Sequence, residues 1–274
     1  MDDYNKSNLE VRQMKLFERK SAITREWEKL MEQEIRYINK RIEKKDNILN
    51  QKLEEKVPAK LQETLDTAFA KAFGLIFEKG TGVIEKTYQR DKLEEEYKVR
   101  QYAADLRENR KNLKAFTKKA KSAGNKNLLL SSASGVGMGF FGIGIPDIPV
   151  FTGLILKNIY EIALNYGYDY KDEQERYFIL KIVQGALSYG DELMEINQDI
   201  DTYIDTKELP EGYDEIAEIE KTANILSKEL LYMKFLQGIP VVGAIGGVYD
   251  AVYMTKISEY AGLKYKHRYL KGRM

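Results

Sequence analysis

The sequence LQETLDTAFAKAFGLIF, residues 61–77, carries apolar side chains at intervals of three and four residues. This spacing places them on one broad face of an α-helix, and a face of that width is typical of a helix buried in a core. Pro58 stands just before the run, where the fixed φ angle of proline suits the start of a helix. We therefore expect a core helix here. The expected core residues are Leu65, Phe69, Phe73, Phe77, Ile159, Ala163 and Leu226.

Upstream of this helix, residues 9–57 are rich in charge and contain neither glycine nor proline. A narrow apolar stripe runs through them at spacings of three, four and seven residues, which predicts one long helix or two helices with a break near residues 46–47. We accordingly divide the chain into an N-terminal helical arm, residues 1–57, and a helical domain, residues 58–274. The arm either pairs with another chain, which would make an oligomer, or folds back on its own domain.

Composition also favours an all-α protein, a multi-helix bundle. The 274 residues include only five prolines, and 43% hydrophobic with 32% charged residues argues against a disordered chain. There is no cysteine and one histidine, His267, which excludes thiolate chemistry, disulfides and zinc sites built from cysteines or several histidines. His267 lies among basic residues near the C-terminus, so we expect it to be exposed. Residues 1–10 contain no apolar segment, which predicts a cytoplasmic protein without a signal peptide.

Two uncharged, glycine-rich runs, residues 127–146 and 235–249, resemble each other. Both contain Gly-Ile-Pro, and at the same offset of 94 residues Gly153 matches Gly247 and Tyr166 matches Tyr260. We expect a duplicated element, a Gly-Ile-Pro turn or hairpin entering a helix, whose two copies pack as equivalent parts. Small residues spaced by four allow close helix packing. The candidate packing glycines are Gly135, Gly139, Gly144, Gly153, Gly238 and Gly247.

Four stretches taken together resemble the EcsC protein family. They are LQETLDTAFAKAFGLIFEKGTGVIEKTY at 61–88, GIPDIP at 144–149, IYEIA at 159–163 continuing to YGYD at 166–169, and GIP at 238–240. The resemblance covers roughly residues 58–262. It implies no catalytic residues. Because the founding member is encoded beside the ATPase and membrane subunits of an ABC transporter, it implies an accessory role at a membrane transporter.

Charge is strongly segregated along the chain, although the total is only +1. Residues 107–126 hold eight basic residues against one acid, residues 161–220 hold 17 acids against four bases, and residues 264–274 are basic again. A basic segment before an uncharged run is typical of an apolar element that meets anionic lipid. Glycines, serines and the break at 146–147 argue against a full span, so we expect an interfacial or re-entrant element, with a core hairpin as the alternative. The candidate membrane contacts are Lys114, Lys118, Lys119, Lys121, Phe140, Phe141, Ile143, Val241, Val242, Tyr265 and Tyr269.

Carboxylate chemistry is the rival interpretation. Glu192, Glu195 and Asp199 share one helical face and are ligand types that Mg²⁺ or Ca²⁺ accepts. A calcium loop beginning at Asp199 would need glycine at its sixth position and glutamate at its twelfth, where Ile204 and Pro210 stand. We therefore expect a solvated acidic face, no metal and no cofactor.

The sequence thus predicts a non-enzymatic accessory or interaction protein at the cytoplasmic face of the cell membrane. Its expected partner is an anionic membrane surface or a membrane protein complex. Nucleic-acid binding is not expected, because the charge is balanced overall and one long region is acidic. The alternatives are a soluble α-helical binding module and a Mg²⁺- or Ca²⁺-dependent enzyme.

Overall fold

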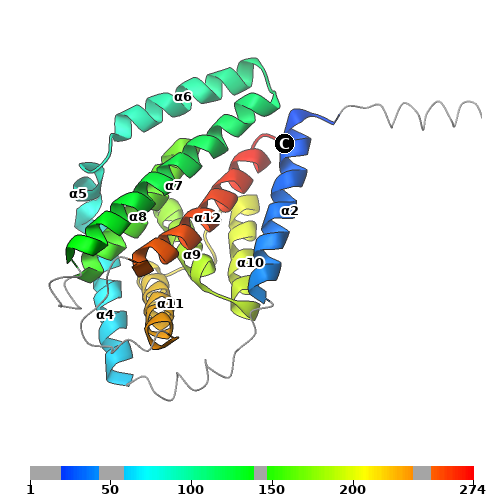
Figure 1. Ribbon diagram of the computed structural model, residues 1–274. Helices are drawn as coiled ribbons and strands as arrows, with labels where there is room; N and C mark the ends of the chain where they lie inside the picture. Colours follow the sequence, from blue (N-terminus) through cyan, green and yellow to red (C-terminus); the bar gives the residue numbers. More distant parts are fainter. Residues whose placement is uncertain (1–19, 43–58, 139–146, 237–247) are drawn as a thin grey trace, which may run out of the picture.

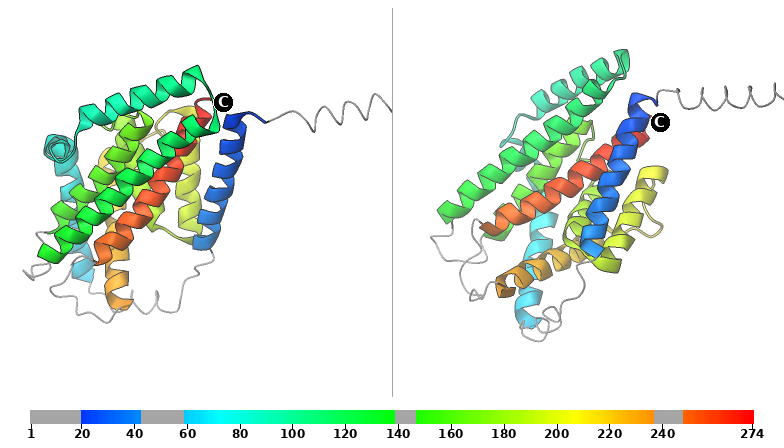
Figure 2. Two further views of the ribbon diagram at one scale, coloured as in Figure 1. Left: turned by 45° about the horizontal axis from the view of Figure 1, so that its top comes forward. Right: turned by 45° about the vertical axis from the view of Figure 1, so that its right-hand side comes forward.

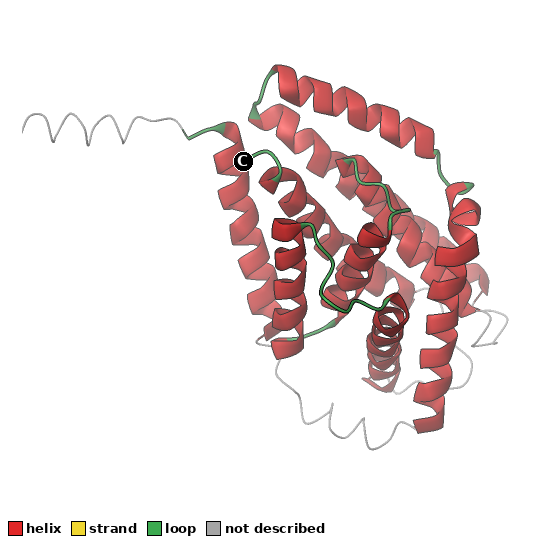
Figure 3. Ribbon diagram, turned by 180° about the vertical axis from the view of Figure 1, so that it is seen from behind, coloured by secondary structure: helices red, strands yellow, loops and turns green. Residues whose placement is uncertain are grey.

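The computed structural model describes residues 20–42, 59–138, 147–236 and 248–274 (Figure 1). Within these ranges every regular element is a helix, and Figure 3 shows helices joined by loops. The all-α prediction is confirmed. In chain order the helices are α2 (Ala22–Ile42), α4 (Ala59–Leu75), α5 (Thr81–Glu85), α6 (Arg90–Leu106), α7 (Arg110–Met138), α8 (Asp147–Tyr166), α9 (Glu173–Leu187), α10 (Gly190–Thr206), α11 (Glu215–Leu236) and α12 (Val248–Lys271).

Helix α12 is the centre of the arrangement, since it contacts α2, α7, α8, α9 and α10. Helices α7, α12 and α2 lie side by side on one face of the bundle, and each contacts the other two (Figure 2, right). Helix α4 packs on α11 and α8, and α6 lies against α7 and α8. The last helix of the chain is therefore enclosed by earlier ones.

The core is densest around α9. Every residue from Tyr177 to Leu187 is buried, and a helix buried on all sides is typical of the middle of a bundle. The predicted core residues Leu65, Phe69, Phe73, Ile159, Ala163 and Leu226 are buried.

Phe77 differs from the prediction, because it is only partly buried where it packs against the core. It lies in a single π-helical turn, Ile76–Gly80, that joins α4 to α5. A π turn holds more residues than an α turn, so side chains in it no longer follow the buried face of the preceding helix. The three- and four-residue spacing of the sequence therefore continues past the point where the α-helix ends.

Tyrosines make up much of the core. The rings of Tyr160 and Tyr170 stack with centroids 3.9 Å apart, and Tyr170 donates its hydroxyl to Glu85 at 2.6 Å. Burial raises the pKa of Tyr160 and Tyr170 well above the usual value for tyrosine. These hydroxyls therefore stay protonated across the physiological range.

The two helices that follow the Gly-Ile-Pro triplets, α8 and α12, pack against each other. Asn158 of α8 donates a hydrogen bond to the hydroxyl of Ser258 in α12 at 2.7 Å. Tyr166 and Tyr260, which the 94-residue offset aligns, are both buried. The triplets themselves lie outside the described residues, so the pairing is seen in the helices alone.

Gly153 does not serve the close packing predicted for it, because nothing lies within 4 Å of a Cβ atom placed there. Gly135 lies within α7. Four further candidates lie outside the described residues: Gly139, Gly144, Gly238 and Gly247. A close approach is found instead at Gly185 in α9, where an added Cβ would lie 2.5 Å from Cε1 of Tyr260. The tight contact of α9 with α12 depends on this glycine.

Candidate functional site

The described part of the N-terminal arm, α2, folds back on its own chain and contacts α12, α10 and α7. Its buried residues include Glu26, Leu30, Glu34, Tyr37 and Arg41, which follow one another at spacings of three and four. Three of these five side chains, Glu26, Glu34 and Arg41, are acidic or basic, and residues of these types are rarely buried unless they are paired. The surface that α2 turns toward the bundle is therefore unusually polar.

We call the acidic and basic side chains that meet between α2 and the helices beneath it the ionic seam. Its members are Glu26, Glu34, Arg110, Asp201, Lys264, Lys266 and His267. They form two clusters, one around each glutamate of α2.

In the first cluster, Glu26 is 1% exposed. It accepts hydrogen bonds from Arg110 Nε at 2.9 Å and from Lys266 Nζ at 3.1 Å. Burial raises the pKa of Glu26, but the bonds from these two cations outweigh burial and hold its pKa below the usual range. Burial lowers the pKa of Lys266; Glu26 opposes this effect, and the nearby positive charges of Lys29 and Lys114 add to it. Basic groups thus crowd the place where α2, α7 and α12 meet.

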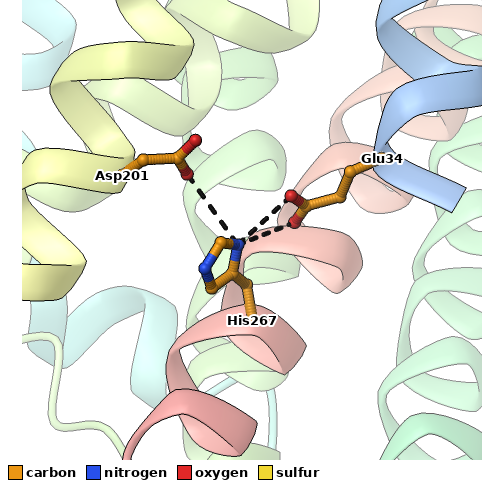
Figure 4. A group of neighbouring side chains, drawn as sticks. All are labelled: Glu34, Asp201 and His267. Atoms are coloured by element: carbon orange, nitrogen blue, oxygen red, sulfur yellow. Dashed lines mark hydrogen bonds and ion pairs between the residues drawn. The ribbon is translucent and has the colours of Figure 1, made fainter. Parts of the chain in front are cut away.

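The second cluster surrounds Glu34 (Figure 4). His267 Nδ1 lies 3.2 Å from both carboxylate oxygens of Glu34 and 3.8 Å from Oδ1 of Asp201. Lys264, which has no exposed surface, places its Nζ 2.8 Å from the same Asp201 oxygen and 3.4 Å from Glu34 Oε2. The ring of Trp27 stands edge-on to the His267 ring, with centroids 4.9 Å apart. The expectation that His267 is exposed is wrong, because α2 covers it.

Glu34, Asp201 and His267 are a donor set that suits a divalent metal, since their ligand atoms lie within 4.8 Å of one another. The ammonium of Lys264, however, already contacts both carboxylates. Its side chain is fully buried, so a metal ion here would sit beside a positive charge that has no room to leave. The residues present fit an internal ion-pair network better than a metal site.

The acidic residues predicted as weak metal candidates do not converge in the part of the chain that the structure describes. Glu192 and Glu195 are exposed on α10. Asp199 instead pairs with Lys181 Nζ at 2.9 Å. No cation site is indicated at this face of α10.

A cavity of about 230 Å³ lies between α4 and α11. Its wall includes Gly74, Phe77, Ile216 and Ile219. Small-molecule sites usually enclose about 300–1,000 Å³, so this hollow offers little support for a ligand-binding enzyme.

A second basic feature lies on the outside of α7. Lys111, Lys114, Lys118 and Lys121 are exposed and follow one another at spacings of three, four and three, which places them along one face of the helix. We call these four residues the α7 lysine stripe. Within the described residues none of the four forms an ion pair with an acid. Lys119 is exposed as well, but it pairs with Glu96 at 2.8 Å and so does not belong to the stripe.

The C-terminal tyrosines predicted to meet a membrane lie inside the protein. Tyr265 has no exposed surface and donates its hydroxyl to Glu175 at 2.6 Å. Tyr269 is 6% exposed and donates to Gln101 at 3.1 Å. Neither ring is available to lipid in this fold.

The basic residues of the same segment are paired too. Arg268 binds Glu175, Lys271 pairs with Asp205 at 3.0 Å and Arg273 pairs with Asp105 at 2.8 Å. Most of their acidic partners come from residues 161–220, the acid-rich region of the sequence. The role of residues 264–274 in membrane contact stays a prediction, and their basic side chains already pair with acids, Lys271 with Asp205 at the surface and Arg268 with Glu175 inside the bundle.

The apolar membrane-contact candidates Phe140, Phe141, Ile143, Val241 and Val242 lie outside the described residues. Among the helices that the structure describes, none combines the length and the apolar character needed to cross a bilayer.

Comparisons with known proteins agree with the sequence resemblance. The chain is 30% identical over 162 residues to "Uncharacterized protein YdbA" of Bacillus subtilis (strain 168), an alignment that covers 56% of each protein. It is 28% identical over 151 residues to "Protein EcsC" of the same organism, covering 52% of this chain and 58% of that protein. The chain thus aligns with little more than half the length of these relatives. No solved structure matches significantly. The sequence model of the EcsC protein family matches residues 19–270, which includes α2, and the chain therefore belongs to the EcsC protein family.

Proposed function

We propose that this protein attaches peripherally to anionic membrane surfaces through the α7 lysine stripe and acts there as a non-enzymatic accessory protein. The observation that carries the proposal is the stripe itself, four exposed lysines on one helical face without acidic partners among the described residues. Each lysine held near an anionic surface contributes about 1 kcal/mol. Because the four lysines have no ion pair to give up, the whole of that attraction is available for binding.

The order of the sequence supports the same proposal. The stripe precedes the uncharged run at residues 127–146, so a basic face is followed directly by chain that carries no charge. A basic surface next to an apolar element is the combination that holds peripheral proteins at anionic lipid, because neither feature suffices alone. An accessory role beside an ABC transporter, which the family resemblance implies, would place the protein at such a surface.

Co-sedimentation with vesicles tests the proposal. We compare vesicles of phosphatidylcholine alone with vesicles that contain 30% phosphatidylserine, each over a series of salt concentrations. The test variant replaces Lys111, Lys114, Lys118 and Lys121 with Gln. The control variant makes the same change in net charge at exposed lysines on α4 and α11, namely Lys60, Lys71, Lys221 and Lys228.

The wild type and the control variant are expected to bind the anionic vesicles, and binding should weaken as salt screens the charges. The stripe variant should lose at least tenfold in affinity. Equal binding by the stripe and control variants would show that the stripe is not the contact. No binding by the wild type at low salt would contradict attachment through the exposed stripe.

A further inference from the structure

Helix α2 is held to the bundle by buried ion pairs as well as by apolar side chains. Besides Leu30 and Tyr37, it buries two carboxylates that lie eight residues apart, Glu26 and Glu34. Eight residues correspond to about 12 Å along a helix, so the two carboxylates reach two separate groups of cations beneath α2. Ion pairs therefore hold α2 at two places along its length.

The surface beneath α2 is strongly basic. It presents Arg110, Lys264, Lys266 and His267 toward α2, and Asp201 is the acid of that surface within the seam. The counter-charges of Glu26 and Glu34 come from α2 itself. We call this surface of α7, α10 and α12 the basic groove. Without α2, the basic groove would keep its basic side chains and Asp201, and it would lose the carboxylates of Glu26 and Glu34.

The basic groove is continuous with the α7 lysine stripe. Arg110, at the start of α7, belongs to the groove, and Lys111 and Lys114 of the stripe follow on the same helix. Lys114 also lies close enough to Lys266 to act on its charge. Helix α2 therefore lies beside the stripe and covers the basic groups that adjoin it.

We propose that α2 is a removable acidic cover, and that its displacement joins the groove to the α7 lysine stripe as one larger surface for anionic lipid. The proposal rests on the proposed function and adds its regulation. In the chain α2 is followed by residues 43–58 and then by α4, so no other described helix is continuous with α2. Lipid phosphates and carboxylates would then replace Glu26 and Glu34 as partners of the buried cations.

Lipid binding and the displacement of α2 are two linked equilibria, so each can be measured through its effect on the other. If lipid binds the uncovered state more tightly than the covered state, lipid must displace α2, and loosening α2 must strengthen lipid binding by the same factor. If lipid bound to the α7 lysine stripe alone, lipid would not displace α2, and loosening α2 would not change the affinity for lipid. Both directions are accessible with full-length protein.

The first experiment weakens the cover with the double variant Glu26→Gln and Glu34→Gln. The matched control is Glu28→Gln and Glu32→Gln, which makes the same charge change on the same helix at exposed side chains. The cover variant is expected to bind vesicles containing 30% phosphatidylserine about tenfold more tightly than the control. Binding no tighter than the control would overturn the cover while leaving attachment through the stripe intact.

The second experiment uses the wild type and is therefore independent of how well the variants fold. Amide hydrogen exchange is followed by mass spectrometry with phosphatidylserine vesicles and with phosphatidylcholine vesicles. Faster exchange in residues 22–42 with anionic vesicles, together with unchanged exchange in α9, is the expected result. Unchanged or slower exchange in α2 on vesicles that do bind the protein would overturn the proposal. If the cover variant binds the vesicles and the wild type does not, the proposed cover is supported and the wild type is in the closed state. If neither protein binds the vesicles, both proposals fail.

Discussion

The two helices α9 and α2 show two ways of burying a helix in one protein. Helix α9 buries the continuous run from Tyr177 to Leu187, which is mostly apolar and aromatic, together with two ion-paired side chains, Glu175 and Lys181. Most of its stability comes from area removed from water. Helix α2 buries carboxylates against lysines, and the cost of taking those charges out of water cancels much of their attraction. Two helices that are buried to the same extent can therefore differ in how strongly they are bound to the rest of the bundle. We expect α9 to resist changes that release α2.

The largest expected effect is alkaline unfolding of the core around α9. Burial raises the pKa of seven fully buried tyrosines, Tyr160, Tyr166, Tyr170, Tyr177, Tyr203, Tyr260 and Tyr265. In the unfolded chain they ionise near pH 10, so their contribution is complete below that pH and is lost as the pH rises above it. Each should cost about 1.4 kcal/mol of unfolding free energy per pH unit above 10.

Urea unfolding at pH 8, 10 and 11, with tyrosine ionisation followed by absorbance at 295 nm, measures this effect. The buried tyrosines should ionise only together with the loss of helical circular dichroism. Ionisation of all the tyrosines near pH 10 in a protein that keeps its helical signal would show that the core is open to water.

A smaller effect is expected in the seam. Glu26→Gln leaves Lys266 without a carboxylate and should lower the unfolding free energy by about 3 kcal/mol. Lys266→Gln should cost less, because Glu26 keeps its bond to Arg110. Glu28→Gln, a side chain 47% exposed, serves as the control and should stay within about 0.5 kcal/mol of the wild type.

Urea unfolding of these three variants and of the Glu26→Gln, Lys266→Gln double variant completes a double-mutant cycle. A positive coupling is expected, with the double variant more stable than the sum of the two single losses predicts. Additive losses would mean that Glu26 and Lys266 do not interact, and the picture of α2 as a helix held by charge would fail.

The smallest effect is expected from a methyl group at the contact between α9 and α12. Gly185→Ala would place a Cβ 2.5 Å from Tyr260 and should cost about 1–3 kcal/mol by overpacking. Gly262→Ala, within α12 and with nothing inside 4 Å, should instead stabilise the protein by about 0.4–1 kcal/mol. The midpoints of thermal unfolding of the two variants test this prediction. Equal midpoints would show that Gly185 and Tyr260 are packed less tightly than the structure indicates.

The sequence predicted the core well because apolar periodicity is a local signal. The spacing of Leu65, Phe69 and Phe73 marks the buried face of α4 without knowledge of what it packs against. The seam could not be predicted in this way, because a charged side chain at a buried position has the same appearance in a sequence as one in solvent. The partner of Glu34, His267, is 233 residues away, and only the fold brings them together.

Some of the missed features did leave a trace in the sequence. The order Glu26, Leu30, Glu34 places one acid four residues before and one four residues after a leucine of the apolar stripe, so both acids lie on the face that the leucine buries. The basic C-terminal segment and the acidic region 161–220 are complementary in charge. This complementarity indicates that the two regions pair, as Arg268 does with Glu175 and Lys271 with Asp205.

The placement of Trp27 gives the protein an optical signal of its own. It is the single tryptophan of the chain, it lies on α2, and its ring meets His267 within the seam. Indole emission shifts to longer wavelength when the ring moves from a protein interior into water. The intrinsic fluorescence of the unlabelled protein therefore reports on one helix alone, and a stopped-flow record of that emission would time the departure and return of α2 directly.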